Sequence, residues 1–164
     1  MKFWAGLTVV AAFTLVALNL GGADHWMRVV AKQTASTGFI ALAITAGALR
    51  WNYGRVMLVG LVFSWWGDFF LTRSGDTFFL LGLVSFLLAH VMYCVGFGVR
   101  GVRWPAAAAT IPVVVVLTGV VLWWISPHVG ADMTWPVRAY TAVISLMVIL
   151  AVGAKGAGGP WSIP

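Results

Sequence analysis

Six apolar runs separated by short polar turns divide this chain along its length. They cover residues 3–20, 29–49, 56–72, 77–99, 106–125 and 137–154. An apolar run of about 20 residues suits one transmembrane helix, because a helix satisfies its own backbone hydrogen bonds in hydrocarbon. The pattern therefore predicts an all-α fold, a polytopic transmembrane helix bundle with six spans.

The composition is that of a membrane protein. Hydrophobic residues make up 62% of the chain and charged residues 9%, which is far from the balance of a soluble domain. We expect a single transmembrane domain over residues 1–164. The net charge of +6 lies mainly in short loops, so its expected counterpart is membrane lipid rather than nucleic acid. The single cysteine, Cys94, excludes an internal disulfide.

The orientation follows from the basic residues, since Lys and Arg favour cytoplasmic loops. A cytoplasmic N-terminus places six basic residues inside and four outside. The inner group is Lys2, Arg50, Arg55, Arg100, Arg103 and Lys155, and the outer group is Arg28, Lys32, Arg73 and Arg138. We expect a multi-pass protein of a bacterial-type inner or plasma membrane. This orientation also gathers Lys32, Asp68, Arg73, Arg138 and Tyr140 near one membrane face.

Two ionisable side chains, Asp68 and His90, lie inside apolar runs. An aspartate in the middle of a membrane helix costs roughly 3 kcal/mol on insertion scales, so it usually has a task or a partner. Each group belongs to a stripe along one helical face. The stripes are Gly60, Ser64 and Asp68 in one helix, and Gly82, Phe86, His90 and Tyr93 in the next. Together they predict a polar pocket inside the membrane.

The depths of the two groups differ. At a rise of about 1.5 Å per residue, Asp68 lies about 7 Å and His90 about 20 Å from the polar turn at residues 73–76. Direct contact between them is therefore not assumed. As a structural alternative, Asp68 pairs with Lys32 or Arg138.

The motifs resemble those of the lysoplasmalogenase family, also called YhhN-like. The residues that carry the resemblance are Lys32, Ser64, Gly67, Asp68, Phe79, Gly82, Phe86, His90, Tyr93, Pro136, Tyr140 and Met147. Gln33 stands where the family usually has a proline. The family normally has eight helices, and its seventh carries a second membrane aspartate. We expect this chain to lack the last two helices, to be inactive without them and to self-associate through the face that they would cover.

The resemblance implies a hydrolase that cleaves the vinyl-ether bond of a lysoplasmalogen-type lysophospholipid without a cofactor. Enol ethers are protonated on carbon, and water captures the resulting oxocarbenium ion. Asp68 is then the candidate acid or cation stabiliser, and His90 orients water or relays protons. The candidate substrate-binding residues are Tyr93 and Tyr140, with Lys32, Arg73 and Arg138 as possible partners of the phosphate.

Other functions stay open. The chain could be a non-enzymatic small membrane carrier, or a lipid- or ligand-binding bundle that uses Asp68 and His90 as a proton relay. Lys32 could simply extend its side chain to the interface, and His90 could be an interhelical hydrogen-bonding residue. A catalytic zinc site, which usually has three protein ligands, is disfavoured because His90 is the one histidine inside a predicted span.

The topology is testable with reporter fusions. Fusions after Arg55, Ser74 and Arg103 should report inside, outside and inside, because the basic loops at residues 50–55 and 100–103 favour the cytoplasm. A signal from the outer side at Arg103 would reverse the predicted orientation.

Overall fold

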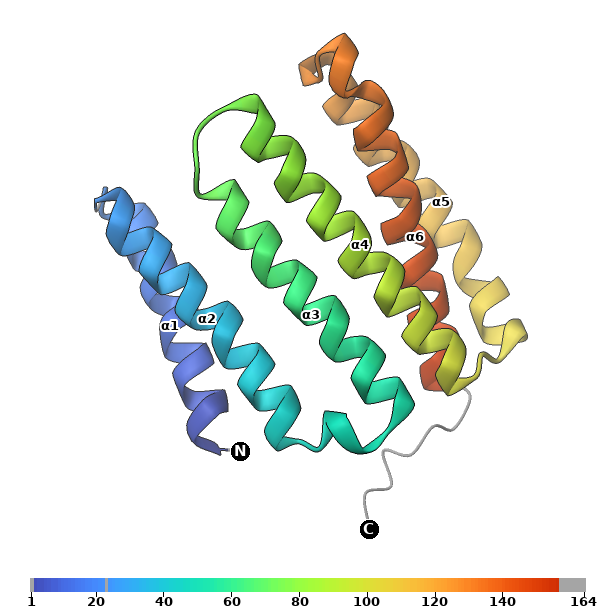
Figure 1. Ribbon diagram of the computed structural model, residues 1–164. Helices are drawn as coiled ribbons and strands as arrows, with labels where there is room; N and C mark the ends of the chain where they lie inside the picture. The colour runs from blue at the N-terminus through green and yellow to red at the C-terminus, as the bar shows by residue number, and fades with distance from the viewer. Residues whose placement is uncertain (1, 23, 157–164) are drawn as a thin grey trace. The chain divides into compact units, whose positions relative to one another are not determined.

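The computed structural model describes residues 2–22 and 24–156, and the regular elements in these ranges are all helices (Figure 1). The α-helices are α1 (Lys2–Leu20), α2 (His25–Thr45), α3 (Asn52–Leu71), α4 (Asp76–Arg100), α5 (Trp104–Ile125) and α6 (Thr134–Gly156). Three short 3₁₀ turns are η1 (Ala48–Arg50), η2 (Ser126–His128) and η3 (Ala131–Met133). The predicted all-α class is confirmed, with one helix for each apolar run.

The second helix differs most from its predicted range. It begins at His25 rather than at residue 29, and it ends at Thr45 rather than at residue 49. Gly47 follows with a φ of 88°, a left-handed conformation that glycine adopts easily and that ends a helix. Because α2 begins at His25, the polar residues before the apolar run, including Arg28, are helical.

Four helical stretches within the described residues are long and apolar enough to cross a membrane. They are Asn52–Leu71, Asp76–Arg100, Trp104–His128 and Ala131–Ala154. Phe3–Leu18 is a shorter apolar stretch. α2 is not among the four, and its first half carries Arg28, Lys32 and Gln33. The membrane character of the fold is thus confirmed. That all six helices cross the membrane stays a prediction.

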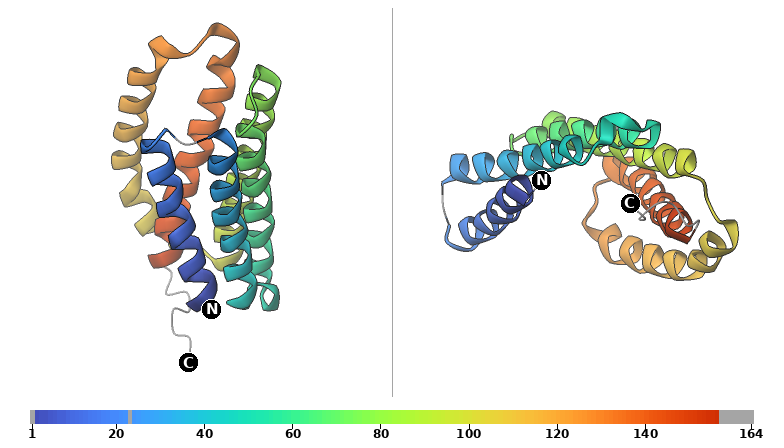
Figure 2. Two further views of the ribbon diagram at one scale, coloured as in Figure 1. Left: turned by 90° about the vertical axis from the view of Figure 1, so that its left-hand side faces the viewer. Right: turned by 90° about the horizontal axis from the view of Figure 1, so that it is seen from below.

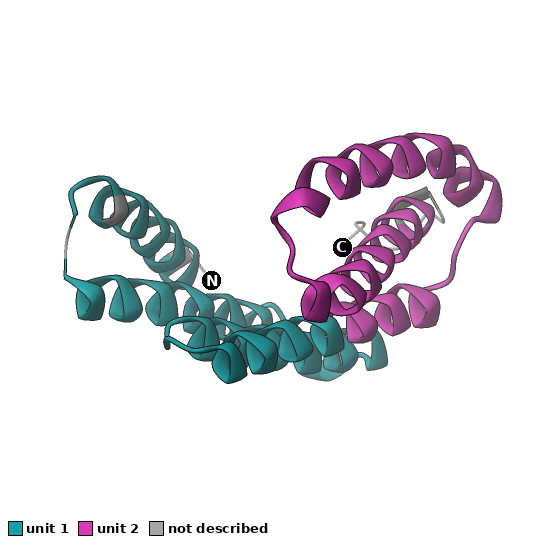
Figure 3. Cartoon of the chain, turned by 90° about the horizontal axis from the view of Figure 1, so that it is seen from above, with its two compact units in different colours: residues 1–89 teal, residues 90–164 magenta. Residues whose placement is uncertain are grey.

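Contacts divide the chain into two compact units, residues 1–89 and 90–164 (Figure 3). Unit 1 holds α1, α2, α3 and the first part of α4, and unit 2 holds the rest of α4, α5 and α6. In unit 1, α1 packs on α2 and α2 packs on α3. The turns that join α1 to α2 and α3 to α4 lie at one end of this unit (Figure 1).

Small side chains form the interior of both units. The buried residues include Ala11, Ala31, Ala35, Gly38, Gly54, Gly60, Gly67, Ala89, Ala107 and Ala154. Among the described residues, no large side chain is fully buried, and many Phe, Leu, Val and Trp side chains are exposed. This arrangement is typical of membrane helices, which associate through close backbone approach while their large apolar side chains face lipid.

In unit 2, α5 packs on α6 (Figure 2). The hydroxyl groups of Thr118 and Ser145 lie 2.7 Å apart between these helices. Near the end of α6, a Cβ atom on Gly153 would lie 3.0 Å from the Cβ atom of Ala107. Hydroxyl pairing and small residues thus hold the two helices together.

Two glycines interlock α3 with the first part of α4. A Cβ atom on Gly67 would lie 2.6 Å from Cδ2 of Phe86, and one on Gly82 would lie 2.6 Å from Cδ2 of Leu71. Each glycine therefore leaves the space that a large side chain of the opposite helix fills. Because Gly67 precedes Asp68, this contact also fixes the position of the acidic residue along the helix pair.

Adding a methyl group at Gly67 should disrupt this contact. We expect Gly67→Ala to lower the free energy of unfolding by about 1–3 kcal/mol, because the Phe86 ring must move. The matched control is Gly119→Ala on α5, where an added Cβ meets nothing within 4 Å. Thermal unfolding in detergent micelles would measure both, and equal stability of the two variants would contradict the close approach.

Candidate functional site

Asp68 lies at the interface of α3 with α2, and both of its carboxylate oxygens have partners. Nζ of Lys32 lies 3.1 Å from Oδ1, and the hydroxyl of Ser36 donates a hydrogen bond to Oδ2. The side chains of Lys32 and Asp68 are 28% and 19% exposed. The ion pair and the hydrogen bond offset the cost of placing a carboxylate among apolar helices.

The local structure of α2 explains this arrangement. Lys32 and Ser36 are four residues apart, so they lie one above the other on the same helical face. Gly38 of the same helix lies against Thr8 of α1, whereas Ser36 and Thr37 contact residues of α3. A short hydroxyl side chain such as Ser36 can then reach the carboxylate of Asp68.

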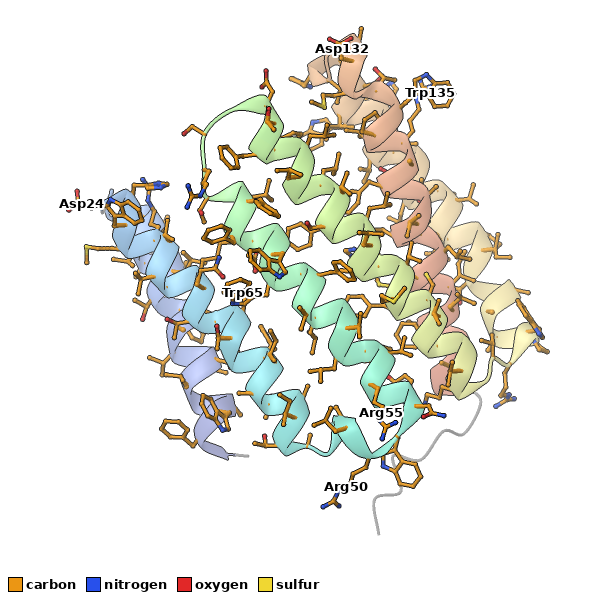
Figure 4. All side chains as sticks on the ribbon, in the orientation of Figure 1. Asp24, Arg50, Arg55, Trp65, Asp132 and Trp135 are labelled. Atoms are coloured by element: carbon orange, nitrogen blue, oxygen red, sulfur yellow. The ribbon has the colours of Figure 1, made fainter. Side chains whose placement is uncertain are left out.

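Trp65 forms a second polar contact between the same helices. Its indole Nε1 donates a hydrogen bond to Oγ1 of Thr37 at 3.0 Å, and Figure 4 labels its side chain beside α2. The ring stacks on Phe69 with an interplanar angle of 1° and a centroid distance of 6.0 Å. Trp65 therefore joins α2 to α3 one turn away from the Lys32–Asp68 ion pair.

Arg73 contacts aromatic rings in the turn after α3. Its Cζ atom lies 4.9 Å from the ring centroid of Phe69 and 5.6 Å from that of Phe78, which are distances of cation–π contacts. The side chain is exposed. In the described part of the chain, the basic partner of Asp68 is Lys32 rather than Arg73.

His90 lies in unit 2 between two tyrosines. Its ring centroid is 5.8 Å from that of Tyr93, one turn further along α4, and 5.4 Å from that of Tyr140 on α6. The interplanar angles are 74° and 83°, so both contacts are edge-on. An imidazole beside two phenol groups can exchange protons and position a polar ligand.

Arg138 belongs to a different part of unit 2. Its Cζ atom lies 5.8 Å from the ring centroid of Trp135. It lines a cavity of about 560 Å³ at the connected ends of α5 and α6. The other lining residues are Leu122, Trp123, Ile125, Ser126, Pro127, Val129, Thr134 and Val137, so Tyr140 does not contribute to this cavity.

The predicted site residues thus form two clusters. Lys32 joins Asp68 in unit 1, as one of the two expected pairings, and Tyr93 and Tyr140 join His90 in unit 2. Arg73 and Arg138 contact aromatic rings instead. The roles predicted for all seven residues stay predictions.

Two features of the site were not predicted from the sequence: Ser36 as a partner of Asp68, and a small cavity at the start of α2. This cavity has a volume of about 290 Å³ and is lined by Leu15, His25, Arg28, Val29, Lys32, Leu71 and Thr72. The spacing of His25, Arg28, Lys32 and Ser36 places them along one helical face. That signal was hidden because the predicted helix began at residue 29.

The Lys32–Asp68 pair predicts a clear thermodynamic coupling. Lys32→Met and Asp68→Asn should each destabilise the protein, because each leaves a partly buried charge or amide without its partner. The double variant should be more stable than the sum of the single effects predicts, with a coupling of about 0.5–3 kcal/mol. Thermal unfolding of all four proteins measures this coupling, and strictly additive effects would contradict the ion pair.

The chain is similar in sequence to a known family and to several known proteins. The YhhN family matches residues 27–163. Proteins named Lysoplasmalogenase from Mycobacterium bovis and Mycobacterium tuberculosis are each 31% identical over 163 residues, covering 93% of this chain. The chain spans about 61% of the length of these two relatives. Lysoplasmalogenase TMEM86A of Bos taurus is 32% identical over 106 residues, covering 64% of this chain and 42% of that protein.

No solved structure matches the chain significantly. The family match covers most of the chain, including the helices that carry Lys32, Asp68 and His90. It confirms the resemblance drawn from the spacing of these motifs. The chain belongs to the YhhN family.

Proposed function

We propose that this chain is a membrane-embedded hydrolase that cleaves the vinyl-ether bond of lysoplasmalogen-type lysophospholipids. The observation that carries the proposal is the carboxylate of Asp68, held by Lys32 and Ser36 between apolar helices. The names of the mycobacterial and bovine relatives support the choice of substrate. A partly buried acid–base cluster inside a membrane is the kind of group that marks a functional site.

The reaction consumes one water molecule. A proton adds to the outer carbon of the enol ether, which leaves an oxocarbenium ion at the carbon bonded to oxygen. Water adds to that carbon and loses a proton, and the hemiacetal then breaks its bond to the glycerol oxygen. The products are a fatty aldehyde and a glycerophospho-alcohol. The protein has to supply a proton, stabilise the cation and position the water.

The ion pair favours one of the two roles considered for Asp68. A carboxylate that is paired with an ammonium group and accepts a hydroxyl hydrogen bond is arranged as a fixed negative charge. Such a charge stabilises an oxocarbenium ion most strongly where water is excluded. The proton then comes from another donor, and the ammonium of Lys32, 3.1 Å from the carboxylate, is one at the site.

His90 is proposed to orient water or relay protons. The edge-on contacts with Tyr93 and Tyr140 restrict the orientation of the imidazole ring. The tyrosine hydroxyl groups are proposed to hydrogen-bond the substrate. Arg73 and Arg138, both exposed, are proposed to meet the lipid headgroup.

A second candidate function is a lipid carrier or lipid-binding bundle. It is favoured by an apolar cavity of about 520 Å³ between α1 and α2. The lining residues are Leu7, Val10, Ala11, Thr14, Leu18, Trp26, Met27, Val30, Ala31 and Thr34. A cavity of this size and polarity can hold an alkyl chain without any chemistry. A carrier would bind the lipid and release no aldehyde.

Substitution of the two proposed catalytic residues tests the hydrolase directly. In a chimera completed from a longer relative, Asp68→Asn and His90→Ala should each lower the rate of aldehyde release from a lysoplasmalogen by at least about 100-fold, as expected for the loss of a charge stabiliser or an acid–base group. The matched controls are Asp132→Asn and His128→Ala, the same changes at exposed positions. These controls should keep the native rate.

The chimera continues the 164-residue chain into the part of the Mycobacterium tuberculosis relative that this chain does not span, and the 164-residue chain is assayed beside it. Near-normal turnover by Asp68→Asn would refute the role of Asp68. Lipid binding without aldehyde release by the chimera would instead favour the carrier.

A further inference from the structure

The cavity at the start of α2 has a lining that suits an anion. His25, Arg28 and Lys32 contribute nitrogen donors, and Leu15, Leu71 and Thr72 close it from α1 and from the end of α3. None of the lining residues is acidic. Its volume of about 290 Å³ is close to the lower limit of small-molecule sites. The cavity thus combines several cationic or polar donors with space for a small charged group.

Arg28 is the lining residue of this cavity with a buried, unpaired polar atom among the described residues. Its Nε atom is buried and has no hydrogen-bond partner, which is costly for a guanidinium N–H group. Lys32 differs, because the carboxylate of Asp68 lies 3.1 Å from its ammonium. A ligand with acceptor oxygens in the cavity would satisfy Arg28 without breaking the Lys32–Asp68 pair.

The position of the cavity agrees with a lipid headgroup. The cavity lies where α2 begins at His25 and α3 ends at Leu71. The first turn of a helix carries free N–H groups and the positive end of the helix dipole, both of which favour anions. Helix ends are also where a membrane protein meets the phosphate groups of the bilayer.

We infer that this cavity binds the phosphodiester group of a lysophospholipid, with Arg28 as its main ligand and His25 at its rim. The choice of lipid rests on the proposed function. Guanidinium groups recognise phosphate oxygens through two parallel hydrogen bonds. Because Lys32 lines the cavity and also pairs with Asp68, a headgroup bound here places the lipid beside the proposed catalytic carboxylate.

A binding experiment without turnover tests this inference. The probe is a saturated acyl lysophosphatidylcholine, which has no vinyl ether, measured against the purified chain in a non-ionic detergent. Arg28→Gln should weaken its binding about 10-fold or more, and Arg28→Lys should weaken it less, because the charge remains but the two parallel hydrogen bonds are lost. Binding of a monoacylglycerol with the same chain, which has no phosphate, should not change.

Arg50→Gln is the matched control. It makes the same change of charge at an exposed arginine of η1, at the end of unit 1 opposite to Asp24 (Figure 4). It should bind lysophosphatidylcholine as the native chain does. If Arg28→Gln proves unstable, Thr72→Phe, which fills the cavity without a change of charge, has to show the same loss.

Three results would overturn the inference. They are unchanged binding by Arg28→Gln or Thr72→Phe, equal affinity of the native chain for lysophosphatidylcholine and monoacylglycerol, and binding of inorganic phosphate without binding of the lipid. Aldehyde release is not part of the measurement. If the chain binds the lipid through Arg28 but the chimera releases no aldehyde, the result supports the phosphate site and contradicts the proposed hydrolase function.

Discussion

The ion pair between Lys32 and Asp68 is the interaction on which the candidate site depends. A carboxylate costs several kcal/mol in an apolar environment unless a partner compensates its charge. Lys32 supplies that charge at 3.1 Å, and Ser36 donates a hydrogen bond to the second oxygen. The same pair supports the proposed role of Asp68 as a fixed negative charge, and Arg28 lines the neighbouring cavity with an unpaired Nε atom.

Close helix packing surrounds this ion pair. Gly67 of α3 admits the Phe86 ring of α4, and Gly38 of α2 lies against Thr8 of α1. Helices that carry small residues at their contacts bring short polar side chains within hydrogen-bond distance. The large apolar residues are thereby left for the lipid, which explains why a protein with 62% hydrophobic residues has an interior of Gly, Ala, Ser and Thr.

The two proposed functions share the binding of a lipid and differ in one chemical step. An apolar cavity between α1 and α2 and a cationic cavity at the start of α2 serve a carrier as well as a hydrolase. What favours the hydrolase is the carboxylate of Asp68 next to a proton donor, together with an imidazole, His90, that two tyrosines orient. Family membership supports this choice through the names of the relatives.

The helical class, the family and the prominence of Asp68 and His90 could be predicted from the sequence alone, because hydrophobic periodicity and charges within apolar runs are local signals. The sequence did not determine where α2 begins, since polar residues such as Arg28 can lie in a loop or in a first helical turn. Three features emerged from the packing of the helices instead: Lys32 rather than Arg138 pairs with Asp68, Ser36 completes the cluster, and Arg28 lines a cavity. These features depend on which faces of two helices meet, and that is set by packing between residues distant in the sequence.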